Sequence, residues 1–290
     1  MRAGLRGSHA SQSRPIEFRG HGDLRLVGDA YGDPAARPVV LLHGGGQTRH
    51  AWGNTAAVLA DHGWYAIALD TRGHGDSEWA ASGDYSVDTL AADLRCVIDT
   101  LGTPAAVVGA SLGGITALLA AGEATTPLYR AVVLVDVAPR VEPLGVDRIV
   151  SFMTGRPEGF ATLEEAAEAV ATYNHHRPRP KDVSGLRKNL RRGPDGRLRW
   201  HWDPALMSDK RPGATQNPER QEAAARRLAV PVLLVRGRQS DLLSEAGARA
   251  FLALVPHARY ADVSGAGHMV AGDRNDAFTR AVVDFLSGVS

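Results

Sequence analysis

The sequence has little of several features that mark particular protein classes. It holds one cysteine, Cys96, so no disulfide forms within the chain and no cysteine-based zinc cluster assembles. Its longest apolar runs, such as residues 131–135, reach only the length of a strand, far short of the roughly 20 residues that span a bilayer. The 33 lysines and arginines nearly balance the 32 acidic residues, unlike the strongly basic surface of a nucleic-acid-binding protein. We therefore expect a cytoplasmic protein with no membrane and no nucleic-acid partner.

What the sequence does contain is enough material for one large hydrophobic core. Its 290 residues are 44% hydrophobic, a fraction typical of globular proteins. Residues 1–15 carry three arginines but no apolar stretch, so they predict a flexible N-terminal tail and no secretory signal.

Short β-branched runs alternate with longer helical patterns over most of the chain. This alternation is typical of an α/β protein with a mostly parallel sheet. Residues 16–18 and 24–31 are expected to form a leading antiparallel pair, because a glycine-containing turn separates them. Further strands are predicted at residues 39–42, 65–69, 106–108, 132–135, 232–235 and 259–263, and helices at 86–101, 115–121, 163–173, 246–254 and 276–286.

The strand pattern stops between residues 139 and 228. We therefore expect a core domain formed by residues 16–138 and 229–290, with residues 139–228 inserted as a helical cap. Residues 140–230 contain 17 basic and 12 acidic residues, a net charge of +5. A solvated surface explains this charge as well as a binding role does, so the charge alone assigns no partner.

A serine between glycines follows the strand expected at residues 106–108. Ser111 stands in the pattern Gly-x-Ser-x-Gly, between Gly109 and Gly113, and a helical run follows it. A tight strand-to-helix turn pushes such a serine out of the carboxyl edge of the sheet, and unpaired N–H groups at the helix start favour negative charge there. The context predicts a nucleophile; the alternative is an incidental serine in a glycine-rich turn.

A serine hydroxyl needs a base, and the base needs a group that orients it. His268 follows the last expected strand on a glycine-rich loop, so we predict that it is the base, at the same sheet edge as Ser111. Asp241 is preferred as the acid, because the strand before it directly precedes the strand that leads to His268. Asp136, at the end of the strand at residues 132–135, is the alternative, since it preserves the same order of serine, acid and histidine.

The oxyanion formed when a serine attacks a carbonyl needs two N–H donors. One is expected from Leu112, the residue after the nucleophile. The other is expected from the loop that begins at His43, where three glycines let the backbone approach a ligand closely. Gly45 is the preferred donor, with Gly46 behind it, and a flexible turn is the alternative interpretation.

Together these motifs resemble the α/β-hydrolase superfamily, particularly the capped serine esterases and cofactor-free haloperoxidases related to epoxide hydrolases and haloalkane dehalogenases. The resemblance covers nearly all of the chain after residue 15. It implies an α/β-hydrolase fold, with a mostly parallel central sheet flanked by helices and a helical cap. In similar proteins the segment at residues 72–77 is architectural, so His74 and Asp76 are given no catalytic role. The matching pieces are the His43-Gly44 loop, residues 70–77 (Asp-Thr-Arg-Gly-His-Gly-Asp-Ser), the Ser111 turn, Asp241 and His268.

The serine narrows the expected chemistry. Similar epoxide hydrolases and haloalkane dehalogenases attack carbon with an aspartate, whereas serine suits acyl transfer. Epoxide opening in that family also uses cap tyrosines, and Tyr173 is the one tyrosine of the predicted cap. We therefore expect a serine carboxylesterase acting on small to medium esters, with no metal and no organic cofactor. Lactonases, C–C hydrolases and perhydrolases with the same three residues are alternatives, as is a ligand-binding receptor with a vestigial triad.

The predicted cap also contains candidates for substrate binding. Trp200 and Trp202 are expected to form an apolar wall of the cleft, together with Phe152 and Met153. The equal alternative for the two tryptophans is that they pack the cap onto the sheet domain. A small-molecule ester is the expected partner, and a homo-oligomer is left open.

Overall fold

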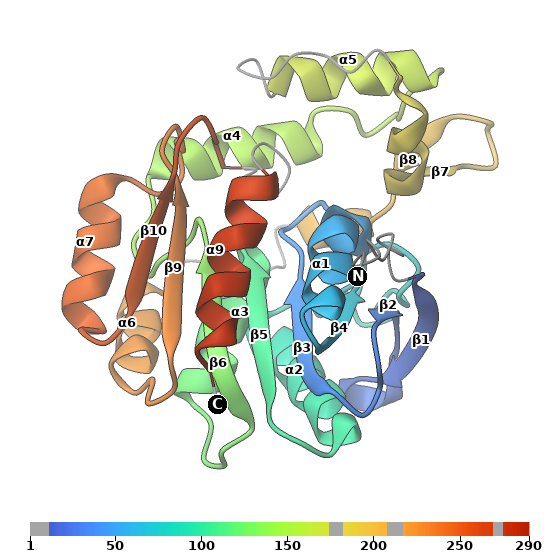
Figure 1. The fold of residues 1–290 in the computed structure, drawn as a ribbon. Coiled ribbons are helices and arrows are strands. Elements are labelled where there is room, and N and C mark those ends of the chain that lie inside the picture. The colour runs from blue at the N-terminus through green and yellow to red at the C-terminus, as the bar shows by residue number, and fades with distance from the viewer. Residues whose placement is uncertain (1–11, 174–181, 208–216, 269–274, 290) are drawn as a thin grey trace, which may run out of the picture.

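The computed structural model describes residues 12–173, 182–207, 217–268 and 275–289. In these residues the main sheet has eight strands in the order β1-β2-β4-β3-β5-β6-β9-β10 (Figure 1). The strands are β1 (Arg14–Arg19), β2 (Arg25–Tyr31), β3 (Arg37–Leu42), β4 (Trp64–Leu69), β5 (Ala105–Ala110), β6 (Tyr129–Val135), β9 (Val232–Gly237) and β10 (Arg259–Val263).

The sheet is mostly parallel, as predicted. Strand β2 pairs antiparallel with both β1 and β4, and the remaining neighbours pair parallel. The predicted leading antiparallel pair is therefore confirmed. One boundary needs correction: Arg14 and Pro15, assigned to a flexible tail of residues 1–15, form the start of β1, with Arg14 opposite Ala30. Residues 1–11 of that tail lie outside the described residues.

Helices cover both faces of the sheet. On one face, α2 (Val87–Leu101), α3 (Leu112–Gly122), α6 (Pro218–Arg226) and α7 (Glu245–Leu254) enclose the larger core; on the other, α1 (Gly53–Asp61) and α9 (Asn275–Ser287) enclose a second core. Successive residues of β3 show the division, since Val40 and Leu42 lie in the first core and Val39 and Leu41 in the second. This is the alternation that a strand imposes on its side chains.

The predicted helix at residues 86–101 illustrates how local sequence sets the ends of an element. Ser86 caps α2, and its side chain accepts a hydrogen bond from the N–H of Thr89. The helix ends at Gly102, which has a φ of 67°, a left-handed conformation that glycine adopts without strain. None of the described helices combines the length and the apolar character needed to cross a membrane.

The segment between β6 and β9 rises above the carboxyl ends of the parallel strands. We call residues 143–207 the cap. Helix α4 lies across the upper ends of the strands, and α5 lies farther out (Figure 1). The cap elements are α4 (Pro143–Thr154), α5 (Leu163–Tyr173), η3 (Ser184–Asn189), β7 (Leu190–Arg192), β8 (Leu198–Trp200) and η4 (Pro204–Met207).

The cap ends earlier than residue 228, the boundary expected from the sequence. Helix α6 falls inside the predicted cap, yet it packs against α3 beside the sheet. A Cβ placed on Gly122 of α3 would lie 2.3 Å from the carbonyl oxygen of Ala224, so the two helices touch at their backbones. Ala224 is fully buried in the larger core, which places α6 in the layer that covers the sheet.

Candidate active site

Ser111 stands where β5 turns into α3. Its φ of 49° is unusual for a residue other than glycine, and it lies in the sharp turn that the sequence predicts. The Ser111 N–H donates to the carbonyl of Val135 over 3.1 Å, and the Ser111 carbonyl accepts from the N–H of Ile115 over 3.0 Å. These bonds hold a backbone conformation that costs about 1–3 kcal/mol, and such conformations cluster at functional sites.

The two glycines of the motif are required by close contact between backbones. A Cβ on Gly109 would lie 2.3 Å from the carbonyl oxygen of Gly113, and one on Gly113 would lie 2.5 Å from that of Leu42. Both distances are far shorter than a van der Waals contact. The glycines therefore let β3, β5 and α3 approach closely enough to form the turn.

The carboxylate beside His268 is that of Asp136. Oδ2 of Asp136 lies 2.7 Å from Nδ1 of His268, and the Asp136 side chain is completely buried. It also accepts hydrogen bonds from the N–H of Gly237 (3.0 Å) and from the hydroxyl of Ser240 (2.5 Å). A buried carboxylate with three donors is held in one orientation, which in turn orients the imidazole.

The predicted assignment of Asp241 as the acid is therefore wrong, because the carboxylate that contacts His268 belongs to Asp136. The Asp241 side chain is 43% exposed, and its Oδ2 accepts a hydrogen bond of 2.7 Å from Arg148 of α4. The reason lies in the sheet order: β6 lies between β5 and β9, so the end of β6 adjoins the Ser111 turn. The loop that carries Asp241 follows β9, one strand farther away.

Ser111, Asp136 and His268 follow β5, β6 and β10 at the same edge of the sheet. The Ser111 N–H is bonded to Val135, the residue before Asp136. Because Asp136 holds Nδ1 of His268, Nε2 is the nitrogen left for a nucleophile. Among the described residues, no hydrogen bond joins the Ser111 hydroxyl to the imidazole. Such bonds in unliganded enzymes are often long and shorten when substrate binds.

The loop after β3, residues 43–47, lies against Ser111, and we call it the oxyanion loop after the role predicted for its glycines. A Cβ on Gly44 would lie 3.4 Å from that of Ser111, and one on Gly45 would lie 3.7 Å from the Leu112 side chain. The Gly44 N–H donates to Gln47, whereas the Gly45 N–H has no partner among the described residues. Two N–H groups near Ser111, those of Gly45 and of Leu112 at the start of α3, are thus placed to receive an oxyanion.

Two buried histidines support this loop. Nδ1 of His43 donates to the Gly44 carbonyl (2.8 Å), and its Nε2 accepts from the N–H of Thr71 (3.1 Å). Burial lowers the pKa of His43, which keeps the ring neutral. The His74 ring lies 4.9 Å from it, edge to face, and Nε2 of His74 accepts from the Gly46 N–H over 3.2 Å. His74 thus has an architectural position, as the resemblance implies.

Of the four cap residues expected to line a pocket, Phe152 and Met153 are half-buried. A Cβ on Gly46 would lie 3.2 Å from Cε of Met153, so this side chain rests on the oxyanion loop. The ring of Phe152 lies 4.5 Å from that of Tyr173 and 5.5 Å from that of Trp200.

The two tryptophans instead pack the cap onto the sheet domain. Trp200 and Trp202 are 9% and 5% exposed, and their rings stack with centroids 5.4 Å apart. The backbone beside Trp202 is bonded to the core on both sides: the N–H of Gly75 donates to His201, and the N–H of Asp203 donates to Gly73, each over 2.7 Å. The burial and stacking of this pair support the packing alternative.

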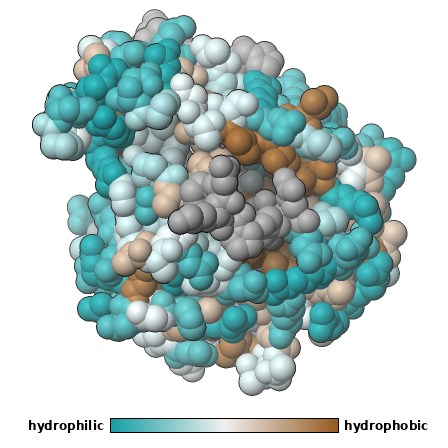
Figure 2. Space-filling model, turned by 180° about the vertical axis from the view of Figure 1, so that it is seen from behind, coloured by the Kyte–Doolittle hydropathy of each residue, from teal (hydrophilic) through white to brown (hydrophobic). Residues whose placement is uncertain are grey.

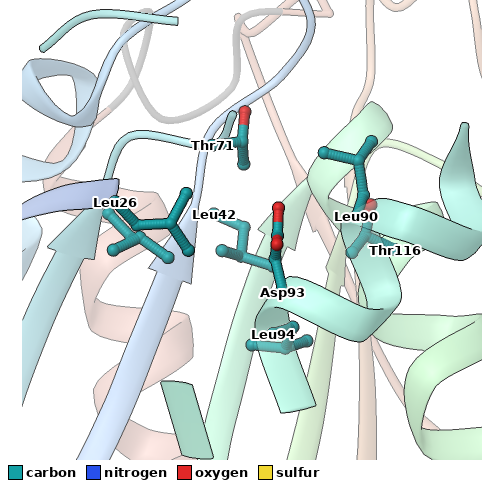
Figure 3. Close-up of a pocket in the computed structure, with 8 residues that line it drawn as sticks. Leu26, Leu42, Thr71, Leu90, Asp93, Leu94 and Thr116 are labelled. Atoms are coloured by element: carbon teal, nitrogen blue, oxygen red, sulfur yellow. The ribbon is translucent and has the colours of Figure 1, made fainter. Parts of the chain in front are cut away.

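A small cavity lies within the core, and apolar residues dominate its lining (Figure 3). Its polar groups already have partners, because Asp93 binds Arg72 through two bonds of 2.6 Å and the Thr116 hydroxyl donates to a carbonyl of its own helix. None of the residues that line this cavity is Ser111, Asp136, His268 or Gly45. The residues that line it are Leu26, Leu42, Leu69, Thr71, Leu90, Asp93, Leu94 and Thr116.

The surface gives a second view of the molecule. Figure 2 shows the side opposite to that of Figure 1, where apolar side chains gather in the upper half of the molecule and the rest is mainly hydrophilic.

Within the parts of the chain that the structure describes, histidine, cysteine and carboxylate side chains do not gather in groups of three that could ligate a metal ion.

This fold and this arrangement of residues define the α/β-hydrolase class. A family model described as alpha/beta hydrolase fold matches residues 37–274, and the chain belongs to this family. The resemblance drawn from the motifs is thereby confirmed, as is the predicted fold.

Several relatives share most of their length with this chain. It is 31% identical over 258 residues to a 3-hydroxybutyrate-oligomer hydrolase of Cupriavidus necator, covering 84% of this chain and 87% of the relative. It is 31% identical over 271 residues to an esterase of Mycobacterium tuberculosis, covering 89% and 84%. These similarities support a hydrolase that acts on ester bonds.

Solved structures agree with the fold. The structure of an E-2-(acetamidomethylene)succinate hydrolase superposes with a TM-score of 0.82 at 24% identity, covering 96% of this chain and all of that one. A structure of the Mycobacterium tuberculosis esterase superposes with a TM-score of 0.76 at 27% identity, covering 97% and 93%.

Proposed function

We propose that this protein is a serine carboxylesterase that hydrolyses small to medium esters through an acyl-enzyme. The observation that carries the proposal is the placement of Ser111 at a strained strand-to-helix turn, beside the buried pair of Asp136 and His268. The relatives named as an esterase and as an oligomer hydrolase support the choice of an ester bond. The substrate is a small molecule, and the chain's own residues supply every group the reaction needs.

The first half of the reaction forms the acyl-enzyme. The Ser111 hydroxyl attacks the ester carbonyl while Nε2 of His268 takes its proton, and the Asp136 carboxylate stabilises the imidazolium that forms. The N–H groups of Gly45 and Leu112 stabilise the negative oxygen of the tetrahedral intermediate. When this intermediate collapses, the imidazolium protonates the departing alcohol, so the C–O bond breaks without releasing an alkoxide.

The second half repeats these steps with water. His268 removes a proton from a water molecule, which attacks the acyl group on Ser111. The same two N–H groups stabilise the second tetrahedral intermediate. Its collapse returns the proton to the Ser111 oxygen and releases the carboxylic acid.

Replacement of the nucleophile tests this proposal. Ser111→Ala is expected to lower kcat for p-nitrophenyl butyrate by about 10⁴-fold or more while the circular dichroism spectrum stays that of the wild type. Ser82→Ala, at an exposed loop serine, is the matched control and should keep full activity. A fluorophosphonate should transfer its phosphonyl group to the wild type with loss of fluoride, raising the mass by that of the reagent minus HF, and should leave the mass of Ser111→Ala unchanged. Hydrolysis that persists in Ser111→Ala would overturn the mechanism.

A further inference from the structure

Helix α4 crosses the candidate active site and contacts the core at both of its ends. At its start, the N–H of Glu142 donates to the carbonyl of Leu242 over 2.8 Å, and a Cβ on Gly145 would lie 2.4 Å from the carbonyl oxygen of Asp241. Near its end, Met153 rests on Gly46 of the oxyanion loop. The helix therefore runs from the loop after β9 to the loop after β3, above the ends of β5 and β6 (Figure 1).

Arg148 lies between these two contacts. Its guanidinium donates to Oδ2 of Asp241 over 2.7 Å and to the backbone carbonyl of Tyr173, and it lies 5.2 Å from the centre of the Tyr173 ring. Phe152 follows one turn later on the same face of α4, and its ring packs on Tyr173. A cation and two aromatic rings thus form one group on the cap.

This group lies close to the catalytic carboxylate. Asp241, which accepts a hydrogen bond from Arg148, follows Ser240 in the chain, and the Ser240 hydroxyl donates to Oδ2 of Asp136 over 2.5 Å. Arg148 on the cap is thus linked through this loop to the carboxylate that holds His268. Its guanidinium is a positive charge on the side of the site that α4 covers.

We propose that Arg148 binds a carboxylate of the substrate, so that the preferred substrates are esters carrying a free carboxylate group. This inference rests on the proposed esterase function. A guanidinium binds a carboxylate through two parallel hydrogen bonds, a geometry that a neutral ester end cannot match. The excess of basic over acidic residues in residues 140–230, 17 against 12, favours the approach of an anion.

The ion pair of Arg148 with Asp241 does not prevent such binding. The Arg148 and Asp241 side chains are 35% and 43% exposed, and ion pairs this open to water are weak. A substrate carboxylate can therefore replace Asp241 on the guanidinium. Asp241 is then a competitor for the anion site, which makes its removal informative.

A purely structural role for the Arg148–Asp241 pair predicts different behaviour. If the pair only holds α4 in place, its loss should weaken hydrolysis of charged and neutral esters alike. If Arg148 binds the substrate, the effect depends on whether the ester carries a carboxylate. The ratio of kcat/KM between matched esters separates the two roles.

Two matched pairs of esters serve as probes, with hydrolysis followed by alkali titration at constant pH. Monomethyl succinate and methyl butyrate differ in a carboxylate or a methyl at the end of the acyl chain. The acetate ester of 3-hydroxypropanoate and propyl acetate differ in the same way on the alcohol side. The wild type is expected to prefer the charged member of at least one pair, and the pair that shows it locates the carboxylate.

The variants then test the residue. Arg148→Gln should reduce the charged-to-neutral ratio of kcat/KM by about 10-fold to 100-fold through KM, and Arg148→Lys should restore part of it. Asp241→Asn should lower KM for the charged ester. The control Arg156→Gln, at an exposed arginine of the α4–α5 connection, should leave the ratio unchanged.

The outcomes separate this inference from the proposed function. A wild-type enzyme that shows no preference in either pair, or an unchanged ratio in Arg148→Gln, would overturn the anion site and leave a Ser111-dependent esterase in place. If the wild type hydrolyses none of the four esters, or does so equally well in Ser111→Ala, both proposals fail.

Discussion

Asp136 and His268 are 132 positions apart in the sequence, yet Oδ2 of the first and Nδ1 of the second lie 2.7 Å apart. The carboxylate is fully buried and the imidazole 12% exposed, so water competes little for this bond. The orienting acid of the proposed triad therefore comes from the end of β6, next to the strand that carries the nucleophile.

Replacing each aspartate distinguishes the two candidate acids. Asp136→Asn is expected to lower kcat by about 10³-fold to 10⁴-fold, because an amide neither stabilises the imidazolium nor keeps the imidazole in the required tautomer. Asp241→Asn should keep kcat for a neutral ester within about threefold of the wild type. Steady-state kinetics with p-nitrophenyl butyrate measures both, and comparable losses in the two variants would show that Asp241 also takes part in catalysis.

Met153 is expected to limit the size of the substrate. Its side chain covers Gly46 of the oxyanion loop, so Met153→Ala removes bulk next to the reacting carbonyl. We predict that the optimum among p-nitrophenyl esters moves to longer or branched acyl chains, with a roughly tenfold gain relative to the acetate. Val150→Ala, at a residue 40% exposed on the same helix, is the control and should leave the chain-length profile as it is. An unchanged profile in Met153→Ala would place the acyl chain elsewhere.

Gly113, two residues after Ser111, is expected to matter for folding. In Gly113→Ala the new Cβ would meet the carbonyl oxygens of Leu42 and His43 at 2.5 and 2.8 Å, so strands or helix must move apart. We expect a loss of about 1–3 kcal/mol in the free energy of unfolding, measured by urea denaturation. Gly185→Ala, with no atom near the added Cβ, is the control. Equal stability of the two variants would mean that the turn tolerates a methyl group.

Acid should destabilise the protein in a pH window set by the buried His43 and the half-buried His50 and His201. Burial is the main cause that lowers the pKa of His43, His50 and His201 below the ordinary value of 6.5. Above pH 6.5 each of these rings is neutral in both the folded and the unfolded protein. Below pH 6.5 the unfolded chain takes up the proton first, because its histidines keep the ordinary pKa. Stability is therefore fully present above pH 6.5 and falls as the pH decreases, by about 1.4 kcal/mol per pH unit for each histidine that stays neutral.

Urea denaturation between pH 7.5 and 5 measures this effect. Carboxyl groups with a lowered pKa act in the same direction but at lower pH; for example, hydrogen bonds lower the pKa of Asp84 below its ordinary 3.8. The window from pH 6.5 to 5 thus reports on the histidines. Stability that stays level or rises there would contradict their assignment as neutral.

Much of the fold could be predicted because its signals are local. The parallel strands are apolar runs buried on both faces, such as β6, and the helices between them carry apolar residues at helical spacing. The start of β1 was missed, since exposed residues dominate Arg14–Arg19. The short strands β7 and β8 also lie outside the predicted strands, because they are rich in arginine.

The acid could not be chosen from the order of residues along the chain. Asp136 and Asp241 both follow strands and both lie between the serine and the histidine. What separates them is the order of strands in the sheet, which depends on contacts between distant segments. One local signal was available: Asp136 stands between Val135 and Val137 in an apolar run, and a carboxylate buried there needs dedicated partners.

Arg148 has no signal of its own in the sequence, since it is one arginine among many in a basic segment. Its position follows from the contacts of α4 with Asp241 and Gly46, which only the folded chain brings together.

The cap leaves the sheet after β6 and returns to it in β9, and these two strands are direct neighbours, with Val132 opposite Val232. The sheet is therefore continuous whatever chain joins them. We therefore expect that a lid of another length and sequence could take the place of residues 143–207 while Ser111, Asp136 and His268 keep their positions. In the proposed mechanism, the groups that break the ester bond and the cap residues that meet the substrate would then lie in separate stretches of the chain, each free to diverge at its own rate.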